Sequence, residues 1–176
     1  NPFGSKNTSS LQFLAFGDWR TAVAFNDNGE IEVGQLATRL NLDLDLKLTG
    51  TERIHAFIRP LDKGGNFTRH EFAGNDREGG TKLELDGNIE TLFFEGDIGA
   101  IYSGVIDEHA SFDLPVALGL TPFIFQNGVW VEDAFTGGAI TLAAKTSSAL
   151  NISNMDFTFF AGFDKVTTPA ARDSLG

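Results

Sequence analysis

Cysteine, basic residues and long apolar runs are missing or scarce in this sequence of 176 residues. Without cysteine the chain has no disulfide, no thiolate metal site and no cysteine nucleophile. No stretch approaches the roughly 18–20 consecutive apolar residues of a membrane-spanning helix, so only strands could enter a bilayer. The 13 basic residues are scattered and outnumbered by 24 acidic ones, for a formal charge of −11. A concentrated positive face for nucleic acid is therefore not expected.

Phenylalanine and glycine are abundant instead. The chain has 17 Phe and 20 Gly but only two Trp and one Tyr. Aromatic residues favour strands, and glycine is frequent in the turns between them. The length is that of one domain with a sizeable core. We predict an all-β, antiparallel fold with long loops and little helix.

Turn signals divide the chain into seven predicted strands. Residues 1–10 are small and polar and predict a flexible arm, 11–165 hold the strands, and 166–176 form a polar tail or a loop leading to further strands. Glycines bound residues 64–80, which have no period and predict a long loop. The strands are expected at 11–25, 31–49, 54–61, 81–97, 110–120, 137–146 and 154–164, with a tight turn at Asn28-Gly29 and a short helix at 98–107.

The strand at 31–49 carries the clearest pattern, because leucine alternates with polar residues along it. Successive side chains of a strand point to opposite faces, so one face is hydrocarbon and the other is charged. The alternation runs from Leu36 to Leu48 with only Thr38 interrupting the apolar face. Strands of soluble proteins have most often about 5–6 residues, whereas a tilted membrane strand needs about 9–11. The length favours a membrane strand.

The following segment predicts a hairpin whose two faces match. With residues 49–53 as a short connection, Leu48 faces Ile54 and the apolar face continues across both strands. On the charged face Asp43 is then opposite Arg59. Opposite charges in cross-strand register are favourable, by roughly 0.2–1 kcal/mol each. Such a sheet suits lipid on one side and a wet lumen on the other.

These segments resemble the N-terminal part of a bacterial outer-membrane porin. The run RLNLDLDLKLTGTERIHAFIRPL, then IETLFFEGDIG, and later LPVALGLTPFIFQNGVWVEDAFTGGAITLAA are similar to the alginate-export and phosphate-selective types. In those porins a strand ends in a glycine and leads through a G-x-W-like loop to a strand that starts with glycine; here these elements are Gly119, residues 127–130 and Gly137-Gly138. The resemblance covers nearly the whole chain and implies the front part of a longer, closed transmembrane β-barrel in a Gram-negative outer membrane.

Two sets of residues follow from this interpretation. The resemblance implies a channel, not an enzyme, that passes small polar or anionic solutes; the acidic excess leaves the sign of its selectivity open. The expected partners are the lipid bilayer and either further strands of a longer chain or further copies, with no nucleic acid. The predicted lumen-lining residues are Arg39, Asp43, Asp45, Lys47, Arg53, His55 and Arg59, and the predicted lipid-facing residues are Leu40, Leu42, Leu44, Leu46, Leu48, Phe157 and Phe159. Trp19, Trp130 and Tyr102 are expected at membrane interfaces.

Two other interpretations remain open. A soluble, secreted β-sandwich or jelly roll that binds carbohydrate or another surface shows the same alternation, because half-buried antiparallel sheets do. An assembly subunit would pair its edge strands with a neighbour by strand addition, with the N-terminal arm as the donor. No cofactor or metal is expected, because HEFAG at 70–74 has Gly where a zinc helix needs a second His, and the acidic turns lack calcium-loop spacing.

Overall fold

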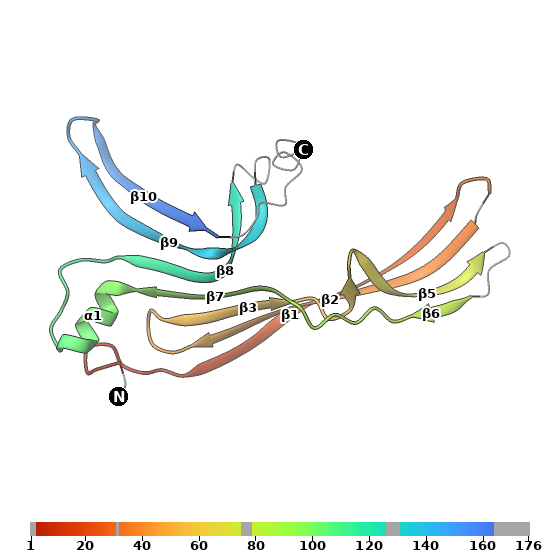
Figure 1. The fold of residues 1–176 in the computed structure, drawn as a ribbon, viewed down its shortest axis with the longest axis horizontal. Helices are drawn as coiled ribbons and strands as arrows, with labels where there is room; N and C mark the ends of the chain where they lie inside the picture. Colours follow the sequence, from red (N-terminus) through yellow and green to blue (C-terminus); the bar gives the residue numbers. More distant parts are fainter. Residues whose placement is uncertain (1–2, 31, 75–78, 126–130, 164–176) are drawn as a thin grey trace. The chain divides into compact units, whose positions relative to one another are not determined.

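A computed structural model describes residues 3–30, 32–74, 79–125 and 131–163 of the chain. The chain forms two compact units (Figure 1). Unit 1 comprises Asn1–Leu14, Asp45–Ala56 and Thr91–Gly176, and unit 2 comprises Ala15–Leu44 and Phe57–Glu90. The polar tail predicted at 166–176 and the loop residues 127–130 of the porin resemblance lie outside the described residues.

Ten strands and one helix make up the described part of the chain. Four strands contribute residues to both units: β1 (Gln12–Asp27), β2 (Glu32–Lys47), β3 (Arg53–Ile58) and β7 (Ile89–Asp97). Unit 2 also contains β4 (Asp62–Lys63), β5 (Asn66–Gly74) and β6 (Gly80–Lys82), and unit 1 contains α1 (Ile98–Ile106), β8 (Pro115–Phe125), β9 (Val131–Ser147) and β10 (Ile152–Gly162). The helix expected at 98–107 is confirmed, and within the described ranges no helix is long and apolar enough to cross a membrane.

Unit 1 is a single antiparallel layer in which β10, β9, β8, β7 and β3 are neighbours in that order (Figure 1). Its registers give the layer two chemically different faces, because cross-strand partners point to the same side. Phe94 pairs with Leu118, while Val116 and Phe159 both pair with Ile140, so large apolar side chains share one face. The opposite face pairs Glu95 with Ala117 and Ala117 with Ala139, so charged and small side chains meet there, and it also carries the aromatic residues Phe93 and Phe160.

Unit 2 is built on the long hairpin of β1 and β2. The turn predicted at Asn28-Gly29 is present: Gly29 has φ 86°, its amide donates to the Asp27 carboxylate, and the Glu30 amide donates to the Asn28 side chain. β5 pairs with β2 from Thr38↔Thr68 to Val33↔Gly74, and β4 and β6 pair with β5. The loop predicted at 64–80 is therefore wrong over 66–74, where β2 supplies a partner that local turn chemistry does not reveal.

The predicted hairpin register after β2 is also wrong. The Leu48 amide donates to the carbonyl of Glu52 rather than facing Ile54, and the Thr49 amide donates to the same carbonyl. The connection is thus tighter than the predicted 49–53. The predicted register would place His55 opposite Lys47, but His55 Nδ1 instead lies 3.6 Å from Asp45 Oδ2. The two faces are unchanged, because a register shift of two residues preserves a period of two.

Almost no apolar core is present in the described residues, where Phe135 is the one buried hydrophobic side chain. Phe135 packs with Phe123 and Phe160, with ring centroids 6.3 and 5.9 Å away. The antiparallel sheet is confirmed. The described strands pair in an open order, however, so closure into a barrel stays a prediction.

Candidate functional site

On the charged face of unit 1, one arginine, one histidine and two acidic side chains from three strands lie close together. Asp45 comes from β2, Arg53 and His55 from β3, and Glu95 from β7. Arg53 Nη1 lies 3.6 Å from Asp45 Oδ2, and its Nε lies 3.4 Å from Glu95 Oε1. His55 is held between the same two carboxylates, with Nδ1 3.6 Å from Asp45 and Nε2 3.4 Å from Glu95. We call these four residues the histidine cluster.

The histidine cluster is partly shielded from water and incompletely hydrogen-bonded. The His55 ring stacks on Phe93, with centroids 4.9 Å apart and planes 26° apart. Asp45 Oδ1 and His55 Nε2 are buried atoms that find no hydrogen-bond partner among the described residues. An unmatched buried polar atom costs about 1–3 kcal/mol, so these two atoms lower the stability of the fold locally.

Unit 2 carries a second cluster, in which two arginines share one carboxylate. Arg39 Nε and Arg59 Nε lie 3.4 and 3.8 Å from Asp62 Oδ2, and Asp62 is nearly buried. Arg59 Nη2 also forms a 2.8 Å ion pair with Glu90. The Arg39 guanidinium lies over the Phe67 ring at 5.8 Å. Arg39, Arg59, Asp62 and Glu90 form the arginine cluster, and the Nε atoms of both arginines lack a hydrogen-bond partner within the described ranges.

Five of the seven predicted lumen residues thus belong to one of the two clusters. The exceptions are Asp43 and Lys47, for which the described residues provide no ion pair. Sequence reasoning missed the acidic partners Asp62, Glu90 and Glu95. For Glu95 a signal was present, because it is a charged residue directly after the apolar run LFF, but only the pairing of β7 with β3 shows which cations it meets.

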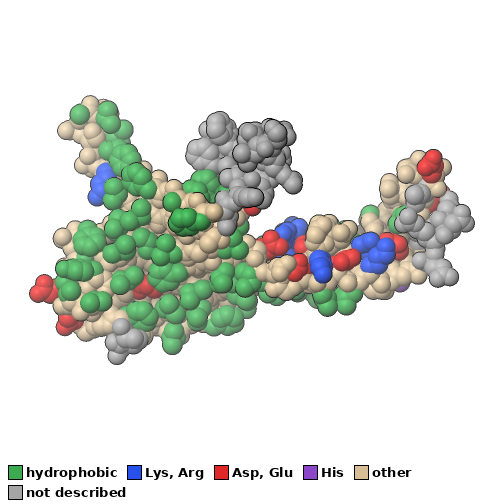
Figure 2. All heavy atoms as spheres, viewed as in Figure 1, with side chains coloured by type: hydrophobic (Ala, Val, Ile, Leu, Met, Phe, Trp, Pro, Cys, Tyr) green, Lys and Arg blue, Asp and Glu red, His purple; other side chains and the backbone are tan. Residues whose placement is uncertain are grey.

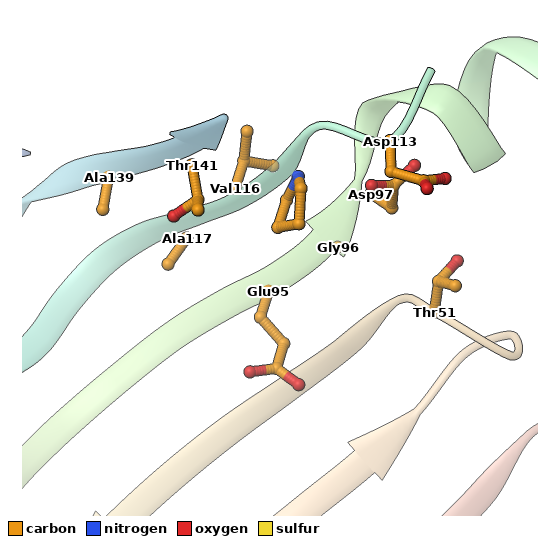
Figure 3. A pocket seen from close by; sticks show the side chains of 10 residues that line it. Thr51, Glu95, Gly96, Asp97, Asp113, Val116, Ala117, Ala139 and Thr141 are labelled. Carbon is orange, nitrogen blue, oxygen red and sulfur yellow. The ribbon is translucent and has the colours of Figure 1, made fainter. Parts of the chain in front are cut away.

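Next to the histidine cluster, the charged face of unit 1 is hollow (Figure 3). A pocket of about 550 Å³ is lined by Glu95 and by the small residues Ala117, Ala139 and Thr141 of β8 and β9. Asp97 and Asp113 close one end, and Figure 3 shows their side chains near one another. The pocket is open because the side chains of these alanine and threonine residues are too small to fill the space above the sheet.

In unit 1 the predicted lipid-facing residues Leu46, Leu48, Phe157 and Phe159 lie on the apolar face, which no second layer of described residues covers, whereas Leu40, Leu42 and Leu44 lie on β2 in unit 2. The leucines from Leu40 to Leu48 are half-buried by their neighbours, whereas Phe157 and Phe159 are 46% and 60% exposed. An apolar hollow of about 490 Å³ on this face is lined by residues that include Phe94, Leu118 and Phe159. Figure 2 shows hydrophobic side chains spread over the surface of unit 1 in that view.

A buried carboxylate that the sequence did not reveal holds the connection between β2 and β3. Glu52 is 1% exposed and accepts hydrogen bonds from the hydroxyls of Thr49 and Thr51 and, at 2.7 Å, from Asn7 Nδ2. Burial by itself raises the pKa of Glu52, but these hydrogen bonds and one from the Asp97 backbone outweigh it, so the pKa lies below its ordinary value. Residues of the predicted flexible arm therefore contact the turn.

Neither a metal-ligand group nor a known relative identifies these clusters. Within the described ranges no three His, Cys, Asp or Glu side chains gather as a metal site. His70 of the HEFAG segment instead lies 2.9 Å from the Thr81 hydroxyl. Comparison with protein-family models, with curated proteins and with solved structures gives no match for this chain.

Proposed function

We propose that this chain forms part of the wall of an outer-membrane β-barrel pore, which passes small polar or anionic solutes along its charged face. The observation that carries the proposal is the uncovered apolar face of a single-layered sheet. A soluble sandwich would bury that face against a second sheet and form a core about 10 Å thick. Lipid would cover it in the proposed pore.

The opposite face supports passage of solutes rather than a dry interior. The histidine cluster combines an arginine and a histidine with two carboxylates, and the arginine cluster combines two arginines with two carboxylates. Their arginine, histidine and glutamate side chains are partly exposed and can therefore form hydrogen bonds with a polar solute or with water. Arg39 and Arg59 offer planar forks to an anionic group, since guanidinium pairs with carboxylate or phosphate through two hydrogen bonds.

Completion of the barrel in this proposal requires strands that pair with β10 and β1. Unpaired strand edges are not tolerated in hydrocarbon, because their amide and carbonyl groups would lack partners. Neither β1 nor β10 contains a lysine or a proline. Such residues protect the edges of soluble sheets, so both strands suit pairing with further strands of a longer chain or of other copies.

Single-cysteine labelling tests the orientation of the faces, because the native chain has no cysteine background. Leu42→Cys, Asp43→Cys and Leu44→Cys variants would carry an environment-sensitive fluorophore and be refolded into phosphatidylcholine vesicles containing spin-labelled lipid. We expect lipid quenching at positions 42 and 44 but not at 43. Equal quenching at all three, or cooperative folding in plain buffer, would contradict the pore and favour the soluble binding module.

Conductance through planar bilayers tests the charged face. Arg53→Glu reverses one charge of the histidine cluster, and we expect the reversal potential in a salt gradient to shift toward cation selectivity. The matched control is Lys63→Glu, which makes the same charge change at an exposed residue outside both clusters. An unchanged reversal potential for Arg53→Glu, or an equal shift for both variants, would argue against a lumen position for this cluster.

A further inference from the structure

The helix α1 has an apolar stripe that the described residues leave partly uncovered. Ile98, Ile101, Tyr102 and Val105 are spaced at i, i+3, i+4 and i+7 and therefore lie on one side of the helix. Exposure rises along the stripe, to 47% at Tyr102 and 77% at Val105. In a water-soluble domain an amphipathic helix turns this side toward the core.

The covered side of α1 consists of glycine and serine instead. A Cβ added to Gly99 would lie 2.1 Å from the Phe112 carbonyl oxygen, and one added to Gly104 would lie 1.8 Å from the Phe3 carbonyl oxygen. Ser103 is buried and donates to the Gly99 carbonyl while accepting from the Ala110 amide. Close backbone contacts thus hold the small-residue side inward and direct the apolar stripe outward.

The start of the stripe is continuous with the apolar face of the sheet. Ile98 and Ile101 line the same hollow as Phe94, Leu118 and Phe159. The helix begins directly where β7 ends (Figure 1). It therefore lies at the end of a strand and on the side of the sheet that the proposed pore turns to lipid.

The charges near α1 indicate which lipid surface would suit it. No lysine or arginine occurs between Ile98 and Leu114, whereas Asp107, Glu108 and Asp113 follow the helix. A basic patch attracts anionic lipid, and this segment has the opposite charge. We therefore expect this acidic segment to suit zwitterionic headgroups, which carry no net charge.

The geometry points to α1 as an interfacial membrane helix, which inserts Tyr102 and Val105 into the headgroup and upper acyl region of a zwitterionic leaflet. This inference rests on the proposed function, because it takes the apolar face as lipid-facing. The helix would add a lipid-binding element at the edge of the proposed pore wall, because its stripe continues the apolar face of the sheet beyond the end of β7. Tyr102 fits such a position, since tyrosine concentrates at membrane interfaces.

Depth-resolved quenching tests the inference separately from the pore. Val105→Cys, Phe159→Cys and the control Glu108→Cys would be labelled with the same fluorophore in phosphatidylcholine vesicles. Lipids would carry the spin label either near the headgroup or in the middle of the acyl chain. We expect the label at 105 to be quenched more by the headgroup-proximal lipid, the label at 159 to be quenched in the acyl region, and the label at 108 to remain in water. Addition of phosphatidylglycerol at low salt should weaken quenching at 105.

The outcomes separate the two proposals. Quenching at 159 without quenching at 105 would overturn the interfacial helix and leave the pore. Quenching at 105 without quenching at 159 would overturn the lipid-facing sheet while supporting lipid contact by α1. Absence of quenching at both positions would overturn both. Stronger quenching at 105 in anionic vesicles would overturn the preference for zwitterionic lipid.

Discussion

At the residue scale, Glu52 is the side chain whose loss should matter most for the connection between β2 and β3. Its buried carboxylate only accepts hydrogen bonds, from Asn7, Thr49 and Thr51. Glu52→Gln replaces one acceptor oxygen with an NH₂ group facing donors, and we expect a loss of about 1–3 kcal/mol in unfolding free energy. The midpoint of urea unfolding in detergent, followed by circular dichroism, measures this. Glu30→Gln, at an exposed position, is the matched control and should leave the midpoint unchanged.

The lowered pKa of Glu52 adds a pH dependence with a defined sign. A carboxyl group whose pKa is lower in the folded state stabilises the fold fully above its unfolded value of about 4.3, and the contribution disappears as pH falls through the folded pKa. Acidification from about pH 5 downward should therefore lower the unfolding midpoint of the native chain more than that of Glu52→Gln. Parallel pH profiles for the two proteins would show that the Glu52 charge makes no contribution.

At the scale of elements, the contact between the N-terminal arm and α1 depends on Gly104. Gly104→Ala would place a Cβ against the Phe3 backbone, and neither main chain can yield without separating the arm from the helix. A loss of 1–2 kcal/mol in this contact changes the undocked population roughly 5–30-fold. Trypsin cleavage after the exposed Lys6 should accelerate by a similar factor, as measured by mass spectrometry of the released N-terminal fragment.

Gly50→Ala provides the control for that experiment. A Cβ on Gly50 has open space around it, so this variant should be cleaved after Lys6 at the native rate. If Gly104→Ala were cleaved no faster than Gly50→Ala, the arm would already be undocked in solution. That result would agree with the flexible arm predicted for residues 1–10.

At the scale of the whole molecule, the near absence of an apolar core from the described part of the chain predicts how the purified protein behaves. Its sheet leaves Phe13, Phe16, Phe25 and Phe159 more than half exposed. Apolar surface of this extent favours association in water, and detergent would cover it. We expect aggregation in plain buffer and a dispersed, β-rich protein with heat-modifiable gel migration in detergent. Size-exclusion chromatography with circular dichroism would decide, and a dispersed, cooperatively unfolding chain in buffer would contradict this prediction.

Local structure and its two faces could be predicted from the order of residues along the chain. Alternation from Leu36 to Leu48 predicted β2, Asn28-Gly29 predicted its preceding turn, and IGAIYSGVID predicted α1, because period and turn chemistry act between neighbours along the chain. The sequence also predicted that Arg53 and His55 lie on the charged face, because the period of a strand assigns a residue to one face whichever strand pairs with it.

The cross-strand partners, in contrast, could be identified only in the folded chain. β5 formed where a loop was expected, because β2 supplies its hydrogen bonds across the sheet. Asp45 meets Arg53 and His55 because the turn is tighter than predicted, and Glu95 joins them because β7 lies beside β3. The outward stripe of α1 likewise depends on contacts with distant backbone at Phe3 and Phe112. Pairing between distant strands is decided by hydrogen bonding and packing over the whole sheet, for which a linear pattern contains no signal.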